Sequence, residues 1–169
     1  MKVNYFLFSL LLTTFAFAII SCKKDASTST LQVNLTDAPA SYAEVNIDIK
    51  EIRVNFSDDS SGWVSLNTNA KVYNLLALQN NVQTVLATGT VQTGMVKEIR
   101  FILGSNNTIV DNSISYPLTI PSGSESGLKI KIGRNLKAGI ENLLIDFDAA
   151  LSITNENGSY KLRPVLRVK

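Results

Sequence analysis

Beyond Leu31 the chain is dominated by an alternation of apolar and polar residues with a period of two, which is typical of half-buried β-strands. The segment VNIDIKEIRVNF follows this pattern but changes parity at Lys50 and Glu51. One extra residue in a strand produces such a change, so the sequence predicts a β-bulge there. One helical turn fits within NLLALQNN, and the remaining strands are expected near residues 31–35, 63–66, 72–78, 85–91, 96–103, 114–120, 128–132, 143–153 and 160–168. Gly, Asn and Ser turns separate these short strands, so the pattern predicts an all-β fold, an antiparallel β-sandwich.

A different pattern occupies the first 22 residues. An uncharged apolar run extends from Tyr5 to Ile20 after Lys2, and it ends at Ser21 and Cys22. The run is short for a membrane-spanning helix and is typical of a signal segment. The sequence IISC resembles a bacterial lipobox, in which the cysteine is acylated and becomes the first residue of the mature chain. The alternative is an inert thiol in an uncleaved anchor or an ordinary signal peptide.

The lipobox resemblance implies a division of the chain into three parts. These are a signal peptide (1–21), an acylated Cys22 with a flexible tether (22–30) and a single β-sandwich domain (31–169). Two or three acyl chains hold a protein on a bilayer durably, because each buried methylene contributes about 0.8 kcal/mol. Lys23 stands where an Asp is the familiar inner-membrane retention signal, so the resemblance implies attachment to the outer membrane, on its periplasmic or its cell-surface face.

Composition narrows the chemistry that the domain can perform. The 169 residues are 45% hydrophobic, which is enough to build the core of one ordinary domain. The net charge is only +2, and the Lys and Arg residues are scattered along the chain without forming a basic block. Nucleic acid is therefore not an expected partner. The chain has no histidine and one cysteine, so it can form neither a Ser-His nor a Cys-His dyad and no disulfide within the chain. No cofactor is expected.

Several segments carry a resemblance to a known family. They are LTDAPA (35–40), YNLLAL (73–78), EIRFIL (98–103), PSGSESGLKI (121–130), IDFDAALSI (145–153) and YKLRPVLRV (160–168). Together and in this order they resemble the domain of unknown function 4382, a family of bacterial envelope lipoproteins. The resemblance implies a prealbumin-like or immunoglobulin-like β-domain in the cell envelope, and it implies no reaction or site.

Acidic residues are the first candidates for chemistry. Asp146 and Asp148 lie two apart, on the same face of an expected strand. With Asp37, or with the loop containing Asp58 and Asp59, they could form an oxygen-rich calcium site. The alternative is an outward-facing charge ladder, and the sequence favours the ladder because nothing matches an EF-hand loop.

The hairpin after this strand supports the ladder. Asn157-Gly158 is the dipeptide best suited to a type I′ turn. A two-residue turn there places Ile153 opposite Leu162, Asp148 opposite Arg167 and Asp146 opposite Lys169. It also places Ala149 opposite Leu166 and Phe147 opposite Val168, so apolar and charged residues separate onto two faces. The register predicts exposed cross-strand ion pairs.

The remaining candidates have weaker signals. Trp63 and Tyr42 are candidates for stacking on a sugar or peptide, although lone aromatic residues near strand starts more often belong to the core. The segment PSGSESG is either a recognition loop or a long hairpin connection. A carboxylate-based hydrolase would need two carboxyl groups across a cleft and one raised pKa, and no pair in the sequence indicates one.

The function expected from the sequence is that of a non-catalytic outer-membrane lipoprotein whose sandwich presents a binding surface to a glycan or an envelope protein. The alternative is a structural subunit of an envelope or fimbria-like assembly, joined by strand addition at a sheet edge. A monomeric domain favours the first function and polymerisation favours the second.

Overall fold

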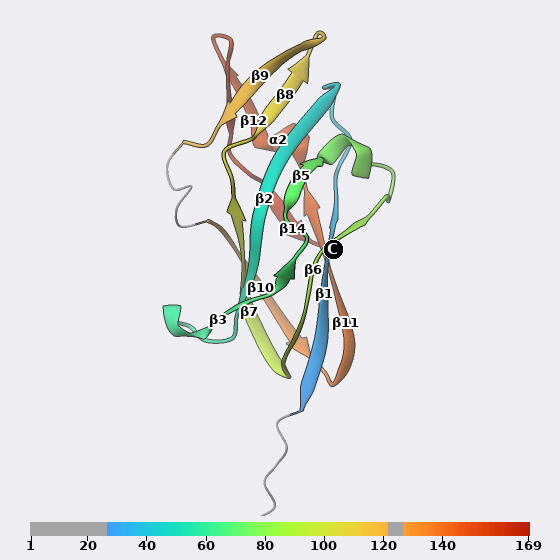
Figure 1. Cartoon of the computed structure of the whole chain (residues 1–169), viewed down its shortest axis with the longest axis vertical. Helices are drawn as coiled ribbons and strands as arrows, with labels where there is room; N and C mark the ends of the chain where they lie inside the picture. The colour runs from blue at the N-terminus through green and yellow to red at the C-terminus, as the bar shows by residue number, and fades with distance from the viewer. Residues whose placement is uncertain (1–26, 122–126) are drawn as a thin grey trace, which may run out of the picture.

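The computed structural model describes residues 27–121 and 127–169, which form two packed β-sheets (Figure 1). The short helical segments are η2 (Ser60–Gly62), η3 (Leu75–Leu78) and α2 (Ala149–Ser152). The strands are β1 (Thr28–Thr36), β2 (Glu44–Asn55), β3 (Trp63–Ser65), β4 (Asn67–Thr68), β5 (Lys71–Asn74), β6 (Thr84–Gln92), β7 (Gly94–Leu103), β8 (Thr108–Asp111), β9 (Ile114–Thr119), β10 (Leu128–Leu136), β11 (Gly139–Phe147), β12 (Ile153–Glu156), β13 (Ser159–Leu162) and β14 (Leu166–Val168). The predicted all-β sandwich is confirmed.

The two sheets are mixed and not purely antiparallel. The first sheet has the order β14-β11-β1-β6-β4, and the second has the order β10-β7-β2-β8-β9-β13-β12, with β3 and β5 pairing to β2. Strand β1 pairs parallel with β11, and β13 pairs parallel with β9. These pairs join strands far apart in the sequence, so the alternation of residues, which reports only burial, could not reveal their direction.

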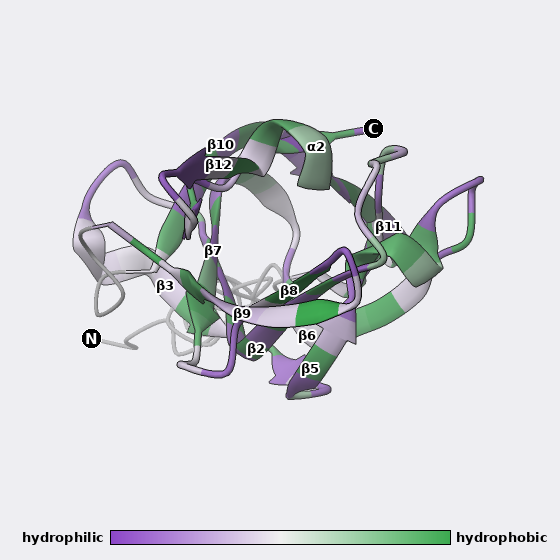
Figure 2. Ribbon diagram, turned by 90° about the horizontal axis from the view of Figure 1, so that it is seen from above, coloured by the Kyte–Doolittle hydropathy of each residue, from purple (hydrophilic) through white to green (hydrophobic). Residues whose placement is uncertain are grey.

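The core lies between the sheets and is built from the inward residues of the alternating pattern. Leu31, Val33 and Leu35 of β1 belong to one hydrophobic cluster with Ile99 and other residues of the second sheet, and all four are almost fully buried. Figure 2, which looks down the long axis, shows the strands of both sheets around this common interior. Burying each such side chain stabilises the fold by about 1.5–3 kcal/mol before the cost of chain ordering.

The β-bulge predicted at Lys50 and Glu51 is confirmed. Ile49 pairs with Leu103 and Glu51 pairs with Ile102, so Lys50 is the extra residue in β2. The helical turn allowed in NLLALQNN is also present, as η3, where the Asn74 side chain accepts a hydrogen bond from the Leu76 backbone N–H.

The strand expected over 143–153 is interrupted. Strand β11 ends at Phe147, α2 occupies Ala149–Ser152, and β12 begins at Ile153. The hairpin register is correct within β12 and β13, where Ile153 lies opposite Leu162. Beyond α2 it is wrong by two residues, because Phe147 pairs with Leu166 and Ile145 with Val168.

The sandwich is elongated and has two distinct ends (Figure 1). One end carries residues 27–30 at the start of β1, the β6–β7 turn (92–95) and the β10–β11 turn (136–140). They lie together because Thr28 pairs with Gln92 and Ser29 pairs with Gly139. We call this the N-terminal pole. The opposite end, the distal end, carries the β8–β9 turn (111–114) and the β12–β13 turn (156–159).

Candidate functional site

The acidic residues singled out in the sequence gather where β1 and β11 end beside α2. Asp148 is the N-cap of α2, and its Oδ1 accepts a hydrogen bond of 3.0 Å from the Leu151 N–H. Its Oδ2 lies 3.7 Å from Arg167 Nη2. Asp146 Oδ2 lies 3.0 Å from the ammonium of Lys169. Both predicted ion-pair partners are therefore present despite the shifted strand register.

The prediction that this ladder is exposed is wrong. Asp146 is 4% exposed and Asp148 is 6% exposed. One physical reason is the helical turn, because it replaces the expected continuation of the strand and makes Asp148 a buried N-cap. A capping Asp followed by Ala, Ala and Leu favours a helical turn over an extended strand.

Asp37 joins the same cluster from the loop after β1. Its Oδ1 accepts a hydrogen bond of 2.9 Å from the Ala149 N–H. The Gln79 side chain approaches the same carboxyl group, but neither Asp37 Oδ2 nor Gln79 Nε2 has a well-directed hydrogen bond. Burial raises the pKa of Asp37 from 3.8 to about 6, against these favourable contacts, and the nearby charge of Asp146 adds to the rise.

Asp37, Asp146 and Asp148, the acidic cluster, are almost inaccessible to solvent, and their contacts are to other parts of the fold. No group of three or more Cys, Asp or Glu side chains within residues 27–121 and 127–169 is placed to hold a metal ion. Neither of the two hollows described next is lined by Asp37, Asp146 or Asp148. The contacts of these residues are to a helix end and to cationic side chains, so they hold the C-terminal segment onto the first sheet.

An open site lies instead around the loop from Phe56 to Gly62, which Asn55 organises. Asn55 is buried, its amide donates to the Asp59 carbonyl at 2.7 Å, and its Oδ1 accepts the Ser57 N–H at 3.0 Å. Asp59 caps η2 by accepting from the Ser61 N–H and hydroxyl. We call this segment the Asn55 loop. Its side-chain contacts hold it in one conformation without a ligand.

At the end of this loop, the backbone of Gly62 lies very close to Ser57 and Asn55. A Cβ atom at residue 62 would lie 2.0 Å from Ser57 Oγ and 2.3 Å from Asn55 Oδ1. Only glycine therefore fits while Asn55 keeps its hydrogen bonds.

A groove of about 470 Å³ lies between the Asn55 loop and the edge of β6. Trp63, Val64 and Phe56 give it an apolar side. None of its lining residues is charged, and the others are Ser57, Ser61, Gly62, Thr90, Val91 and Gln92. We call it the β3–β6 groove. An indole ring beside uncharged hydroxyl and amide groups suits a ligand with both apolar faces and many hydroxyl groups.

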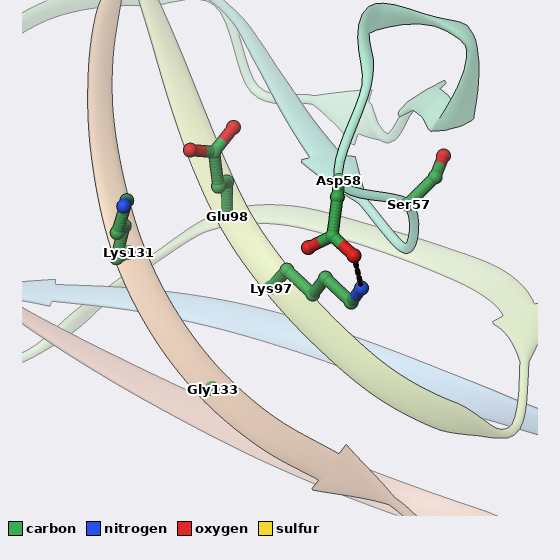
Figure 3. A pocket seen from close by; sticks show the side chains of 6 residues that line it. All are labelled: Ser57, Asp58, Lys97, Glu98, Lys131 and Gly133. Atoms are coloured by element: carbon green, nitrogen blue, oxygen red, sulfur yellow. Dashed lines mark hydrogen bonds and ion pairs between the residues drawn. The ribbon is translucent and has the colours of Figure 1, made fainter.

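A second hollow, of about 320 Å³, lies on the other side of the Asn55 loop and shares Ser57 with the groove. Figure 3 shows its charged lining: Lys97 pairs with Asp58, while Glu98 and Lys131 extend from the neighbouring strands β7 and β10. The two hollows thus differ in character, and only the groove is uncharged.

The two aromatic candidates have different outcomes. Trp63 lines the groove and is half-buried, with the Arg100 guanidinium 4.0 Å from the ring centroid. Tyr42 packs against the core, as the alternative for that residue predicted. Sequence reasoning missed Asn55, Gly62, Thr90 and Gln92. The signal for a loop, SDDSSG, was present, but the β6 edge comes from a strand about 30 residues away and no local pattern joins it to the loop.

Two predictions fall on residues outside those described. Cys22 with its lipobox lies before Ser27, and most of PSGSESG lies within residues 122–126. Among the described residues, no helix has the length and apolar character needed to cross a membrane.

Comparison with known proteins supports the resemblance found in the sequence. The model of the family described as Domain of unknown function (DUF4382) matches residues 28–164. The chain belongs to this family. The matched range covers β1 to β13 and therefore both the acidic cluster and the Asn55 loop of this DUF4382 domain. No curated protein and no solved structure matches the chain.

Proposed function

We propose that this chain is an outer-membrane lipoprotein, anchored through an acylated Cys22, whose sandwich binds a glycan in the β3–β6 groove. The anchor rests on the apolar run and on the single cysteine that follows it. The lining of the groove is the observation from which we propose a glycan as the ligand.

The chemistry of the groove favours a carbohydrate. Sugar rings have apolar C–H faces that stack on aromatic side chains, and their hydroxyl groups exchange hydrogen bonds with hydroxyl and amide groups. Trp63 supplies the ring, and Ser61, Thr90 and Gln92 supply the polar contacts. Because Asn55 and Asp59 already fix the loop, binding loses little conformational freedom. The groove has no carboxyl group, so the proposal is of binding without catalysis.

A second candidate is assembly by strand addition, and one observation favours it. Strand β4 pairs with only Ala87 and Thr88 of β6, which leaves Gly89–Gln92 without a strand partner on that side among the described residues. An extended peptide in the groove would find backbone groups there. Polymerisation of the soluble domain, or its capture of a synthetic strand, would favour this function over glycan binding.

The anchor is tested by changing the cysteine. Cys22→Ala should abolish acylation and leave unprocessed precursor, because the lipoprotein signal peptidase acts on the modified cysteine. Metabolic labelling with a fatty-acid analogue measures this. Label retained by the Ala variant would contradict the lipobox.

The glycan is sought by affinity capture. The soluble domain from Ala26 onward, immobilised, should retain polysaccharide from an envelope extract, and Gln92→Ala should retain at least several-fold less. Asn142→Ala is the matched control, because Asn142 is an exposed amide on the same sheet but lies on β11, away from the groove. Equal retention by both variants would contradict the groove as the site.

A further inference from the structure

The chain between Cys22 and the domain is short, because β1 begins at Thr28, within the range 22–30 that the sequence suggested as a tether. Four residues, 23–26, lie between Cys22 and Ser27. The two residues are therefore five chain steps apart, and at about 3.6 Å per step a fully extended chain spans at most roughly 18 Å. Ser27 is fixed to the β6–β7 turn, because its carbonyl accepts the Thr93 N–H at 3.0 Å and its hydroxyl lies 2.7 Å from the Thr93 hydroxyl. An acylated Cys22 would therefore hold the N-terminal pole within that distance of the bilayer.

The same pole exposes large apolar side chains. Ile140, at the start of β11, is 76% exposed, and Met95, at the start of β7, is 46% exposed. Ile140 has the highest exposed fraction of the large hydrophobic residues described. Neither residue packs on the core. Exposed apolar side chains on the part of the surface closest to a lipid anchor fit the interfacial zone of a bilayer.

Cationic residues accompany these apolar ones. Lys137 in the β10–β11 turn is exposed, and Arg134 is half exposed while it lies 3.6 Å from Glu141. In the sequence, Lys23 and Lys24 follow Cys22 directly. Lysine side chains near a membrane surface interact favourably with phosphate headgroups and with anionic lipids.

We infer that the N-terminal pole rests on the bilayer, with Ile140 and Met95 at the level of the lipid headgroups and the long axis of the sandwich directed away from the membrane. This inference rests on the lipid anchor proposed above. Two side chains do not hold a protein on a membrane by themselves. Once the acyl chains are inserted, however, the effective concentration of the pole at the bilayer is high and a weak contact is sufficient to orient the domain.

The orientation has a consequence for the ligand. Thr90 to Gln92 line the groove and belong to the end of β6 that pairs with Thr28–Thr30 of β1, at the N-terminal pole. The β3–β6 groove therefore lies on the half of the sandwich that would be nearer the membrane. The β8–β9 and β12–β13 turns lie farthest from the lipid. A glycan in the groove would be held near the bilayer, and a partner at the distal end would be held away from it.

The test uses the acylated chain on vesicles of phosphatidylethanolamine and phosphatidylglycerol. Acylation consumes the thiol of Cys22, the one cysteine in the sequence, so an introduced cysteine carries a nitroxide label uniquely. Labels at Ile140→Cys and Met95→Cys report the environment of the N-terminal pole. The matched controls are Ile114→Cys at the distal end, 54% exposed, and Leu151→Cys in α2, 57% exposed. Accessibility of each label to oxygen, which concentrates in lipid, is compared with accessibility to a water-soluble nickel chelate.

The labels at 140 and 95 should show a several-fold higher ratio of oxygen to nickel accessibility than those at 114 and 151. Vesicle-bound, acylated chains with the same ratio at all four positions would overturn the orientation and leave the anchor standing. Reduced access of both reagents at 140 and 95 would also overturn it, because that pattern indicates a protein contact, such as a second copy. Chains that are not acylated and do not float with vesicles would contradict the anchor and the orientation together.

Discussion

The acidic cluster at α2 and the Asn55 loop both contain polar side chains fixed by hydrogen bonds, but they face opposite environments. In the cluster, Asp37 and Asp148 are buried, and they bond to backbone N–H groups of α2. In the loop, Asn55 is buried, while neighbouring loop residues such as Ser57, Asp58 and Ser61 line two open hollows. The buried polar groups in the cluster therefore stabilise the fold, whereas the buried Asn55 orders an exposed surface that could bind a ligand.

This contrast predicts that the two regions separate in experiment. Substitutions in the cluster should change stability and leave binding by the folded protein intact. Substitutions in the loop should change binding more than stability.

The largest expected effect on stability is that of Asp148→Ala. The variant loses the cap of α2 and leaves Arg167 without its partner, so the free energy of unfolding should fall by about 2 kcal/mol. Urea denaturation measures the change. Asp148→Asn is the control, because Asn caps helices as well as Asp does, and it should lose about 1 kcal/mol or less. Equal losses in the two variants would contradict the capping role.

Gly62→Ala should damage the loop. The new methyl group would collide with Ser57 Oγ and Asn55 Oδ1, so the loop must open and the groove lose its shape. We expect glycan affinity to fall by about tenfold or more, with a loss of stability of about 1 kcal/mol. Titration calorimetry and urea denaturation measure the two changes. The contrast between regions fails if Asp148→Ala weakens binding as much as Gly62→Ala does.

Asp37 should give stability a characteristic dependence on pH. Its pKa is raised to about 6 in the folded protein, so the folded state binds the proton more tightly than the unfolded state. The resulting stabilisation is complete below the unfolded value of 3.8 and is lost as the pH rises through the folded value of about 6. Asp37→Asn can still accept the Ala149 N–H, so the variant should lack this decline. At neutral pH its free energy of unfolding should exceed that of the wild type by on the order of 1 kcal/mol. Denaturation of both proteins across this pH range is the measurement, and parallel curves would exclude a raised pKa.

Calcium should produce the smallest effect. The carboxyl groups of Asp146 and Asp148 face Lys169 and Arg167, so a cation would have to displace both partners. The melting temperature of the wild type should stay unchanged when calcium is added. A clear rise that Asp148→Asn abolishes would make these carboxylates ligands.

The fold could be predicted where local patterns determine it. The register of β12 and β13 follows from Asn157-Gly158, since both residues adopt positive φ, 54° and 85°, as a type I′ turn requires. The bulge at Lys50 follows from the change in parity. In both places a few neighbouring residues contain the whole signal.

Prediction failed where distant residues decide. The segment DFDAALSI alternates well enough for a strand, although Asp148 followed by Ala, Ala and Leu also favours a helical turn. Asp37, more than 100 residues earlier, accepts the Ala149 N–H and so adds a contact to α2 that no local pattern contains. The cationic partners were identified correctly, but the burial of the Asp146 and Asp148 carboxyl groups was not, since burial depends on how separate elements pack together. The groove likewise combines the Asn55 loop with β6, and only the three-dimensional structure brings these segments together.

Fluorescence of Trp63 tests the central claim most directly, because the chain has one tryptophan and it lines the β3–β6 groove. Titration of the soluble domain with the polysaccharide recovered by affinity capture should shift and saturate the emission, with a weaker response in Gln92→Ala and an unchanged one in Asn142→Ala. Saturable binding by calorimetry without any change in Trp63 emission would place the ligand elsewhere and contradict the assignment of the groove.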